Sequence, residues 1–320
     1  MMSAQPGSAR SSGAGSTRDL LISAAATAGA AADRAGIRLR PLETLAQMTA
    51  ACRLLEQVWG IREGQQFDVR PHLMRALGHG GNYLVGAYRV ADAELVGASA
   101  GFFTEPLGTS MHSHITGVLP GDAGRGVGAA LKWHQRQWAL ERGLNSITWT
   151  FDPLIARDAH FNISRLGARP HTYYVDFYGV MDDGANRGQP SDRIEAVWDL
   201  SAAATLDAAA GYSQSAGPDI DALLRTGATV LLSVGGDGRP VTAGSARQAV
   251  RVLVGIPRDI ESLRRTDPEL ALTWRYRLRA TLALLMADSS WRVTGFARGG
   301  WYLLSRADGL SMQSPQWTGS

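Results

Sequence analysis

Residues 120–128 read Pro-Gly-Asp-Ala-Gly-Arg-Gly-Val-Gly, and the rest of the chain is best interpreted outward from this stretch. It opens into a helical pattern in which Val127, Leu131 and Trp138 recur at spacings of four and seven residues. Glycines before a helix allow backbone N–H groups to close around an anion, and the helix dipole adds to the attraction. The stretch therefore predicts a phosphate-binding loop, although a tight turn without a ligand explains the same residues.

The position of the loop along the chain shows whether it matches either of two known phosphate-binding motifs. A dinucleotide fingerprint follows the first strand of a βαβ unit, and a P-loop ends in Gly-Lys-Ser/Thr. Here the loop follows the fourth predicted strand, and the Gly-Lys-Ser/Thr ending is absent. Neither nucleotide motif fits.

The flanking patterns predict a mixed α/β domain in the order β-α-α-β-β-β-loop-α-β-α-β. Apolar residues alternate in the expected strands and recur at three and four residues in the expected helices. The expected strands are 37–42, 83–89, 95–103, 111–119, 145–151 and 173–180, and the expected helices are 45–59, 69–77, 127–142 and 156–166.

Three parts of the chain are expected. Residues 1–36, rich in Ala, Gly and Ser, predict a disordered tail with at most one fraying helix. Residues 37–185 form the loop-bearing domain, and 186–320 form a C-terminal α+β extension packed on it. In this extension Asp267 is placed to cap a long helix, whose apolar stripe is Ala271, Trp274, Leu278, Leu282 and Leu285.

Composition limits the classes of binding partner and the cellular compartment that can be expected. The 320 residues carry a net charge of +3, with scattered basic residues, of which Lys132 is the only lysine. Nucleic-acid binders cluster such charge, and no apolar run approaches the roughly 20 residues of a membrane span, so neither partner is expected. The lone Cys52 fits a reducing cytoplasm, and the seven histidines form no metal-binding motif.

The loop and its flanking elements together resemble the GNAT acyltransferase superfamily. Its signature, Gln/Arg-x-x-Gly-x-Gly/Ala, matches at Gly126 and Gly128, with Ala123 at the Gln/Arg position. The resemblance implies a GNAT-type, mostly antiparallel central sheet flanked by helices, with an acyl-coenzyme A bound at the loop and along the fourth strand, and no metal. The residues that it implies for coenzyme A are Thr116, Val118, Gly124, Arg125, Gly126, Val127, Gly128, Ala129 and Asn162.

A closer resemblance is to a branch of long GNAT chains similar to acyltransferases encoded beside N-acylamino-acid racemases. That branch implies an amino-acid-like acceptor and an acetyl-CoA or succinyl-CoA donor; Asp158 stands where the branch is expected to have Asn. The segments that carry the likeness are Ser113-His114, Leu131-Lys132, Trp149–Leu154, Ala159–Asn162, Leu166–Ala168, Pro190–Arg193 and Trp274-Arg275.

Acyl transfer to an amine needs a base for the amine and neutralisation of the thiolate. We favour His114 as the base, because a period of two places it on one strand face with His112 and Thr116; a packed strand histidine is the alternative. Glu105 is the second candidate. The family's usual tyrosine acid corresponds to Ile163, so Tyr173 or Tyr174 is the nearest donor unless the thiolate leaves unprotonated.

On the acceptor side, the predicted substrate residues are Ser113, Trp149, Asp152, His160 and Arg193. The sequence thus predicts an acyl-CoA-dependent N-acyltransferase for a small amine or amino acid. A non-catalytic acyl-CoA-binding module and an acyl-CoA hydrolase stay open as alternatives, and a homodimer is among the assemblies left open.

Overall fold

The computed structural model describes residues 12–61, 65, 67, 69–179, 181, 189–211 and 217–307. The chain divides into two compact units. The first unit holds Met1–Ile147 with Asp199–Ala202, and the second holds Thr148–Trp198 with Ala203–Ser320. The division falls inside strand β5 (Ser146–Phe151) rather than near residue 185. Each unit is therefore described by itself.

In the first unit four antiparallel strands lie between helices. An added Cβ at Gly97 would contact Val127 and Leu131 of α4, whereas one at Gly117 would contact Leu55 and Trp59 of α2. The two helices therefore cover opposite faces of the strands. Each of the strands β1 to β4 pairs with the next one along the chain. The elements are β1 (Ile37–Pro41), α2 (Leu45–Trp59), α3 (Pro71–His79), β2 (Tyr83–Arg89), β3 (Leu95–Thr104), β4 (Ser110–Val118) and α4 (Val127–Glu141).

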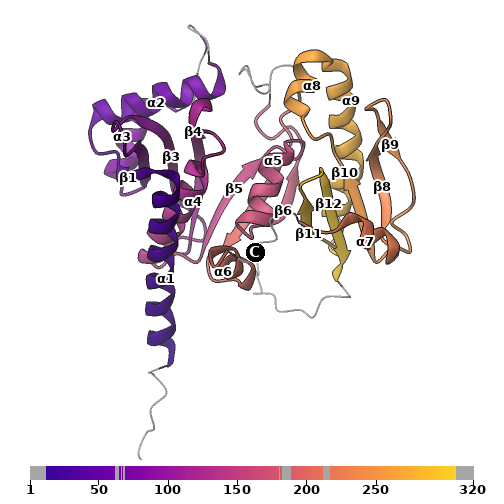
Figure 1. The fold of residues 1–320 in the computed structure, drawn as a ribbon, viewed down its shortest axis with the longest axis horizontal. Coiled ribbons are helices and arrows are strands. Elements are labelled where there is room, and N and C mark those ends of the chain that lie inside the picture. Colours follow the sequence, from indigo (N-terminus) through magenta and orange to yellow (C-terminus); the bar gives the residue numbers. More distant parts are fainter. Residues whose placement is uncertain are drawn as a thin grey trace, which may run out of the picture. The chain divides into compact units, whose positions relative to one another are not determined.

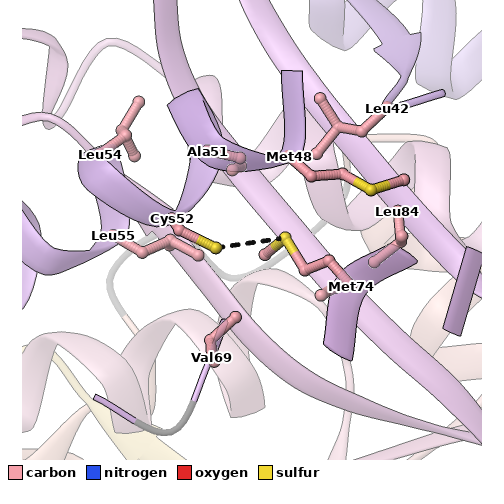
Figure 2. Close-up of a cluster of buried hydrophobic side chains, with 11 residues drawn as sticks. Leu42, Met48, Ala51, Cys52, Leu54, Leu55, Val69, Met74 and Leu84 are labelled. Carbon is pink, nitrogen blue, oxygen red and sulfur yellow. Dashed lines mark hydrogen bonds between the residues drawn. The ribbon is translucent and has the colours of Figure 1, made fainter. Parts of the chain in front are cut away.

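The hydrophobic core of this unit lies under α2. Met48, Cys52 and Leu55 are buried, as their helical spacing predicts, while Leu45 is exposed. Figure 2 shows the Cys52 thiol directed at the sulfur of Met74, at 3.7 Å. Burial raises the pKa of Cys52 to about 11, so this thiol is an inert core group.

Helix α1 (Ser12–Ala35) replaces the disordered tail that composition predicts, and it packs beside α4 (Figure 1). Its buried residues Ala24, Ala28 and Ala31 recur at four and three residues. Alanine is the best helix former, and its small side chain permits close helix packing. The prediction of disorder is wrong for residues 12–35, and residues 1–11 lie outside the described residues.

In the second unit the strand β7 (Arg193–Asp199) corrects the predicted domain boundary. It pairs antiparallel with β6 (Arg169–Tyr174), in the strand order β1-β2-β3-β4-β5-β7-β6. A boundary at residue 185 omits this seventh strand, and the strand expected at 173–180 ends at Tyr174. The predicted fold class, a mixed and mostly antiparallel sheet with flanking helices and a C-terminal α+β extension, is confirmed. Between β5 (Ser146–Phe151) and β6 lie α5 (Ala156–Ala159) and a π-helical segment, His160–Arg165.

The C-terminal extension builds a second sheet in the order β11-β12-β10-β8-β9 (Figure 1). Asp267 caps α9 as predicted, accepting a hydrogen bond from Leu270 N, and the predicted stripe is buried throughout. No described helix is long and apolar enough to span a bilayer. The elements are α6 (Ala203–Ala209), α7 (Ile220–Arg225), β8 (Thr229–Val234), β9 (Pro240–Thr242), β10 (Arg251–Gly255), α8 (Ile260–Thr266), α9 (Pro268–Leu278), a π-helical Arg279–Ala283, α10 (Leu284–Ala287), β11 (Trp291–Ala297) and β12 (Trp301–Arg306).

Candidate functional site

The glycine loop joins β4 to α4 in the first unit and is held at its start by an ion pair. Buried Asp122 pairs with Arg89 at the end of β2, with Nη2 2.8 Å from Oδ2. Gly124 and Gly126 then take φ values of +78° and +92°, in the left-handed region that favours glycine. Gly126 is the N-cap of α4, and no side chain caps this helix.

The loop leaves both space and hydrogen-bond donors for a ligand. The N–H groups of Val127, Gly128 and Ala129 occupy the first helical turn, where no intrahelical acceptor exists. A Cβ added at Gly124 would meet nothing within 4 Å, and one at Gly126 would meet only Ala35 Cβ, at 3.7 Å. An anion can therefore approach the backbone here. Arg125 is exposed beside it.

A β-bulge at His114 divides the side chains of β4 between the two faces. Ser113 pairs with Gly101 but Ile115 pairs with Ala100, so His114 is the extra residue. Thr116 is 2.8 Å from Ser99 on the α4 face, whereas the rings of His112 and His114 lie 5.3 and 5.8 Å from that of Phe102, on the α2 face. The prediction that Thr116 shares a face with the two histidines is wrong, because the bulge breaks the period of two.

The two predicted bases differ in position. His114 is exposed in the interior of β4, and its ring lies against Phe102. Glu105 is exposed in the loop after β3, at the opposite end of β4 from the glycine loop. The structure therefore places His114, but not Glu105, between the two ends of the strand that leads to the glycine loop.

A buried lysine underlies β4 on the α4 face. Lys132, 6% exposed, donates hydrogen bonds to Ser113 Oγ at 2.7 Å and to Gln135 Oε1 at 3.3 Å. Burial disfavours the charged ammonium and lowers the pKa of Lys132 to about 7. Near neutral pH this side chain therefore exists in both protonation states.

Replacing Lys132 by methionine is expected to stabilise the protein by about 3 kcal/mol at pH 6, because the buried charge costs free energy below the folded-state pKa. In the wild type the unfolded chain keeps its proton up to about pH 10.5 and the folded chain only to about pH 7. Wild-type stability therefore rises with pH across this window, and the advantage of the variant shrinks.

Chemical denaturation at pH 6 and pH 9 measures this difference. Arg136→Met is the matched control, since burial lowers the pKa of Arg136 only to about 10. Its effect should be nearly the same at both pH values. An advantage of Lys132→Met that does not change between pH 6 and pH 9 would contradict the lowered pKa.

In the second unit Asp152 is the centre of an arginine cluster. Arg275 binds it through Nη1 and Nη2 at 2.8 and 2.6 Å, Arg264 Nη2 lies 2.6 Å away and Arg193 Nη1 lies 4.0 Å away. Burial alone would raise the pKa of Asp152, but the three guanidinium groups hold it well below its usual range. Asp152 is therefore a buried structural anion rather than a free acid or base.

A second carboxylate, Asp192, engages the predicted acid. Arg279 binds it at 2.9 and 2.6 Å, and the Tyr173 hydroxyl donates to it at 2.7 Å. Burial and the Asp192 charge raise the pKa of Tyr173, and burial and Glu195 raise that of Tyr174. Both tyrosines are thus poor proton donors. The side chain of Arg193 donates to the backbone oxygen of Asp192.

The remaining predicted residues of the second unit are buried. Trp149 packs edge-on against Trp198, with ring centroids 5.9 Å apart. His160 and Asn162 lie in the π-helical segment, and burial with Arg298 and Arg165 nearby lowers the pKa of His160. A polar cavity in this unit is lined by residues 155–157, 258–261 and 265, and none of the predicted site residues lines it.

The structure brings together the loop residues 124–129 with Val118, and separately Asp152 with Arg193. Sequence reasoning missed the role of Lys132, although its being the only lysine was a signal. It also missed Arg264 and Arg279, which lie more than 80 residues from the carboxylates they bind and carry no motif.

Comparisons with known proteins give structural likeness only. The chain is similar to an N-acetyltransferase from Staphylococcus aureus Mu50, at 11% identity over 52% of this chain and 99% of that one, with a TM-score of 0.43. It is similar to the ribosomal-protein-S18-alanine N-acetyltransferase from Escherichia coli, at 15% identity over 52% and 96%, with a TM-score of 0.41. A GNAT family acetyltransferase from Elizabethkingia anophelis with acetyl-CoA bound is 10% identical over 51% and 98%, with a TM-score of 0.35. No protein-family model and no curated protein matches the chain, so a function must be argued from its own residues.

Proposed function

We propose that this chain is an acyl-CoA-dependent N-acyltransferase that transfers an acetyl or succinyl-type group to a small amine or amino acid. The observation that carries the proposal is the loop 124–129, where left-handed glycines leave the uncapped first turn of α4 open to a pyrophosphate. The GNAT-type order of elements on either side of this loop supports the same ligand.

Strand β4 supports the placement of the rest of the cofactor. Val118, next to the loop, pairs with Gly97, and Ser113 pairs with Gly101, so the two lie four residue steps apart along β3, which is about 13 Å. This length is comparable to that of an extended pantetheine arm. An acyl-CoA whose pyrophosphate occupies the loop and whose arm follows β4 would therefore present its thioester near Ser113 and His114.

The arginine cluster of the second unit suits an acceptor that carries a carboxylate. Among the described residues, Arg193, Arg264, Arg275 and Arg279 lie around the carboxylates of Asp152 and Asp192. A guanidinium group can bind the carboxylate of a ligand through two parallel hydrogen bonds. We assign Arg193 to this role because it also lies over the exposed ring of Tyr178, 5.3 Å from the ring centroid.

Thiol release from acetyl-CoA and succinyl-CoA, measured against a panel of amino acids of both hands, tests the function. Release that depends on the acceptor, with an N-acyl amino acid as product, supports the proposal. Release without any acceptor would indicate a hydrolase. Thermal stabilisation by coenzyme A without release would indicate a binding module.

Replacing His114 by alanine or glutamine is expected to lower kcat by roughly a hundredfold, the usual scale for the loss of a general base. The coenzyme A-induced thermal shift should stay the same, because His114 lies away from the glycine loop. In the wild type kcat should rise with pH through the range of a histidine pKa, and this limb should disappear in the variants.

His112→Ala is the matched control for this prediction. His112 lies on the same strand against the same Phe102 ring, so its loss removes a similar packing contact. If His112→Ala and His114→Ala reduced kcat equally, or if the pH limb survived in His114→Ala, the proton would be taken by another group.

A further inference from the structure

The identity of residue 132 needs an explanation beyond charge. The chain has 32 Lys and Arg residues, and Lys132 is the only lysine. One helical turn later Arg136 is fully buried and donates its Nε to Leu200 O at 2.9 Å. Because α4 buries an arginine so close by, a buried cation alone does not require a lysine. A lysine differs from an arginine in that it can lose its proton near neutral pH.

The hydrogen bond to Ser113 has a direction that suits proton transfer. The Lys132 ammonium is the donor and Ser113 Oγ the acceptor. A hydroxyl that accepts one hydrogen bond still has its own proton to donate. Within the described part of the chain, Ser113 Oγ has no second hydrogen-bond partner. This proton is therefore available to a bound ligand.

The position of the pair matches the sulfur of the proposed acyl-CoA, and this step rests on the proposed function. Ser113 lies about 13 Å along β4 from Val118. Lys132 lies six residues into α4 from Gly126, about 9 Å along the helix axis. Both side chains occupy the α4 face of the strand, whereas His114 lies on the other face, so the strand separates an acid on one side from a base on the other.

Departure of the thiolate needs a donor that the predicted tyrosines do not provide. Tyr173 donates to Asp192 and Tyr174 to Glu195, and Ile163 stands at the family's usual acid position. We propose that Ser113 protonates the departing coenzyme A thiolate and that the Lys132 ammonium replaces the proton. Ser113 is then a catalytic residue and Lys132 a positioning residue that acts through it.

The acceptor nitrogen forms the C–N bond, and the C–S bond breaks with its electron pair on sulfur. The sulfur takes the hydroxyl proton of Ser113, which takes a proton from Lys132 Nζ. Lys132 becomes neutral, and the proton lost by the acceptor amine passes to His114.

The environment of Lys132 supports this exchange. Burial alone lowers its pKa to about 7, close to the working pH, where an acid transfers protons most effectively. Two of its hydrogen-bond partners, Ser113 and Gln135, are neutral. The ionisable groups on the elements around α4 are engaged with other residues or directed elsewhere. Tyr83 contacts His134, Arg89 binds Asp122, and His112 and His114 lie on the other face of β4. The exposed ones are Arg18, Asp19, Asp33, Arg34, Arg38 and Arg40.

The test compares wild type, Ser113→Ala, Ser113→Thr and Lys132→Met, using the amino acid that supports the fastest thiol release. With acetyl-CoA, Ser113→Ala and Lys132→Met should lower kcat by about a hundredfold, and Ser113→Thr, which keeps the hydroxyl, should retain most of it. Wild-type kcat should fall as pH rises through about 7, because the ammonium must be protonated. Lys132→Met should lack this limb.

A donor with a more acidic thiol separates acid catalysis from a structural role. The acetyl thioester of 4-nitrothiophenol releases a thiolate that needs no proton. Wild type and both deficient variants should therefore differ by less than about threefold in kcat/KM with this donor. NMR of protein labelled at the lysine Cε gives one resonance, which should titrate near pH 7 rather than near 10.5.

Several results would overturn the proposal. These are an undiminished kcat in Ser113→Ala, an equal loss with both donors, or a lysine that titrates near pH 10.5. Lys132→Met, which is expected to be more stable than wild type, keeps the test decisive if Ser113→Ala does not fold. A wild type without acceptor-dependent transfer would overturn the proposed function as well, whereas active wild type with unaffected variants would overturn this inference alone.

Discussion

Replacing Asp152 by asparagine is expected to destabilise the protein by about 3 to 5 kcal/mol, the usual cost of removing one partner from a buried ion pair. The variant would leave Arg275, fully buried, and Arg264 beside a neutral amide. The loss is a large part of the stability of a typical domain, so a lowered midpoint in urea and a reduced yield of folded protein are expected.

The pH dependence of this loss follows from the lowered pKa of Asp152. A carboxylate whose folded-state pKa lies below its unfolded value of about 3.8 contributes stability above that value and loses it as pH falls toward the folded pKa. The difference between wild type and Asp152→Asn should be constant from pH 5 to pH 7 and shrink in stronger acid. Asp237→Asn is the matched control, because its pair with Arg239 is 65% exposed and should contribute less than about 1 kcal/mol. Equal effects of the two substitutions would contradict the role of the cluster.

Replacing Gly126 by valine is expected to abolish the thermal stabilisation by coenzyme A. A valine there would place its side chain in the open space before the first turn of α4, which we assign to the pyrophosphate. Ligand binding raises stability in proportion to the logarithm of ligand concentration over Kd, so a titration of coenzyme A measures the loss directly.

Gly143 provides the control for Gly126→Val within the same helix. It lies just past the other end of α4, with a φ of +74° and nothing within 4 Å of an added Cβ. Gly143→Val therefore carries a similar backbone strain of about 1 to 2 kcal/mol, but at a distance from the loop. It should lower the melting temperature of the free protein and leave the coenzyme A-induced shift intact. An intact shift in Gly126→Val would place the ligand elsewhere.

Local patterns predicted much of the fold because the helices and strands have apolar periods that match their burial. The bounds of α2 and β2 agree with the predicted ranges, and the stripe of α9 is buried as expected. Helix α1 was missed because alanines and glycines resemble a disordered tail in composition, while burial beside α4 depends on distant residues. Strand β7 was assigned to the extension because the polar residues before it resemble a domain linker.

The candidate site was predictable only in part. The glycine loop has a contiguous motif, and its left-handed glycines lie where the sequence places them. The arginines around Asp152 and Asp192 come from α8, α9 and the π-helical segment that follows, and only tertiary structure brings them to β5 and β7. The opposite directions of His114 and Thr116 depend on a register shift that no local pattern reveals.

His114 is the extra residue of the bulge, so the pairing of β4 with β3 does not depend on it. Deleting this one residue would restore regular alternation, with Ser113 still beside Lys132 and Ile115 still opposite Ala100. The sheet would survive while the proposed base is lost. A descendant of this chain could therefore lose amine transfer through the deletion of a single codon and keep its fold and its glycine loop.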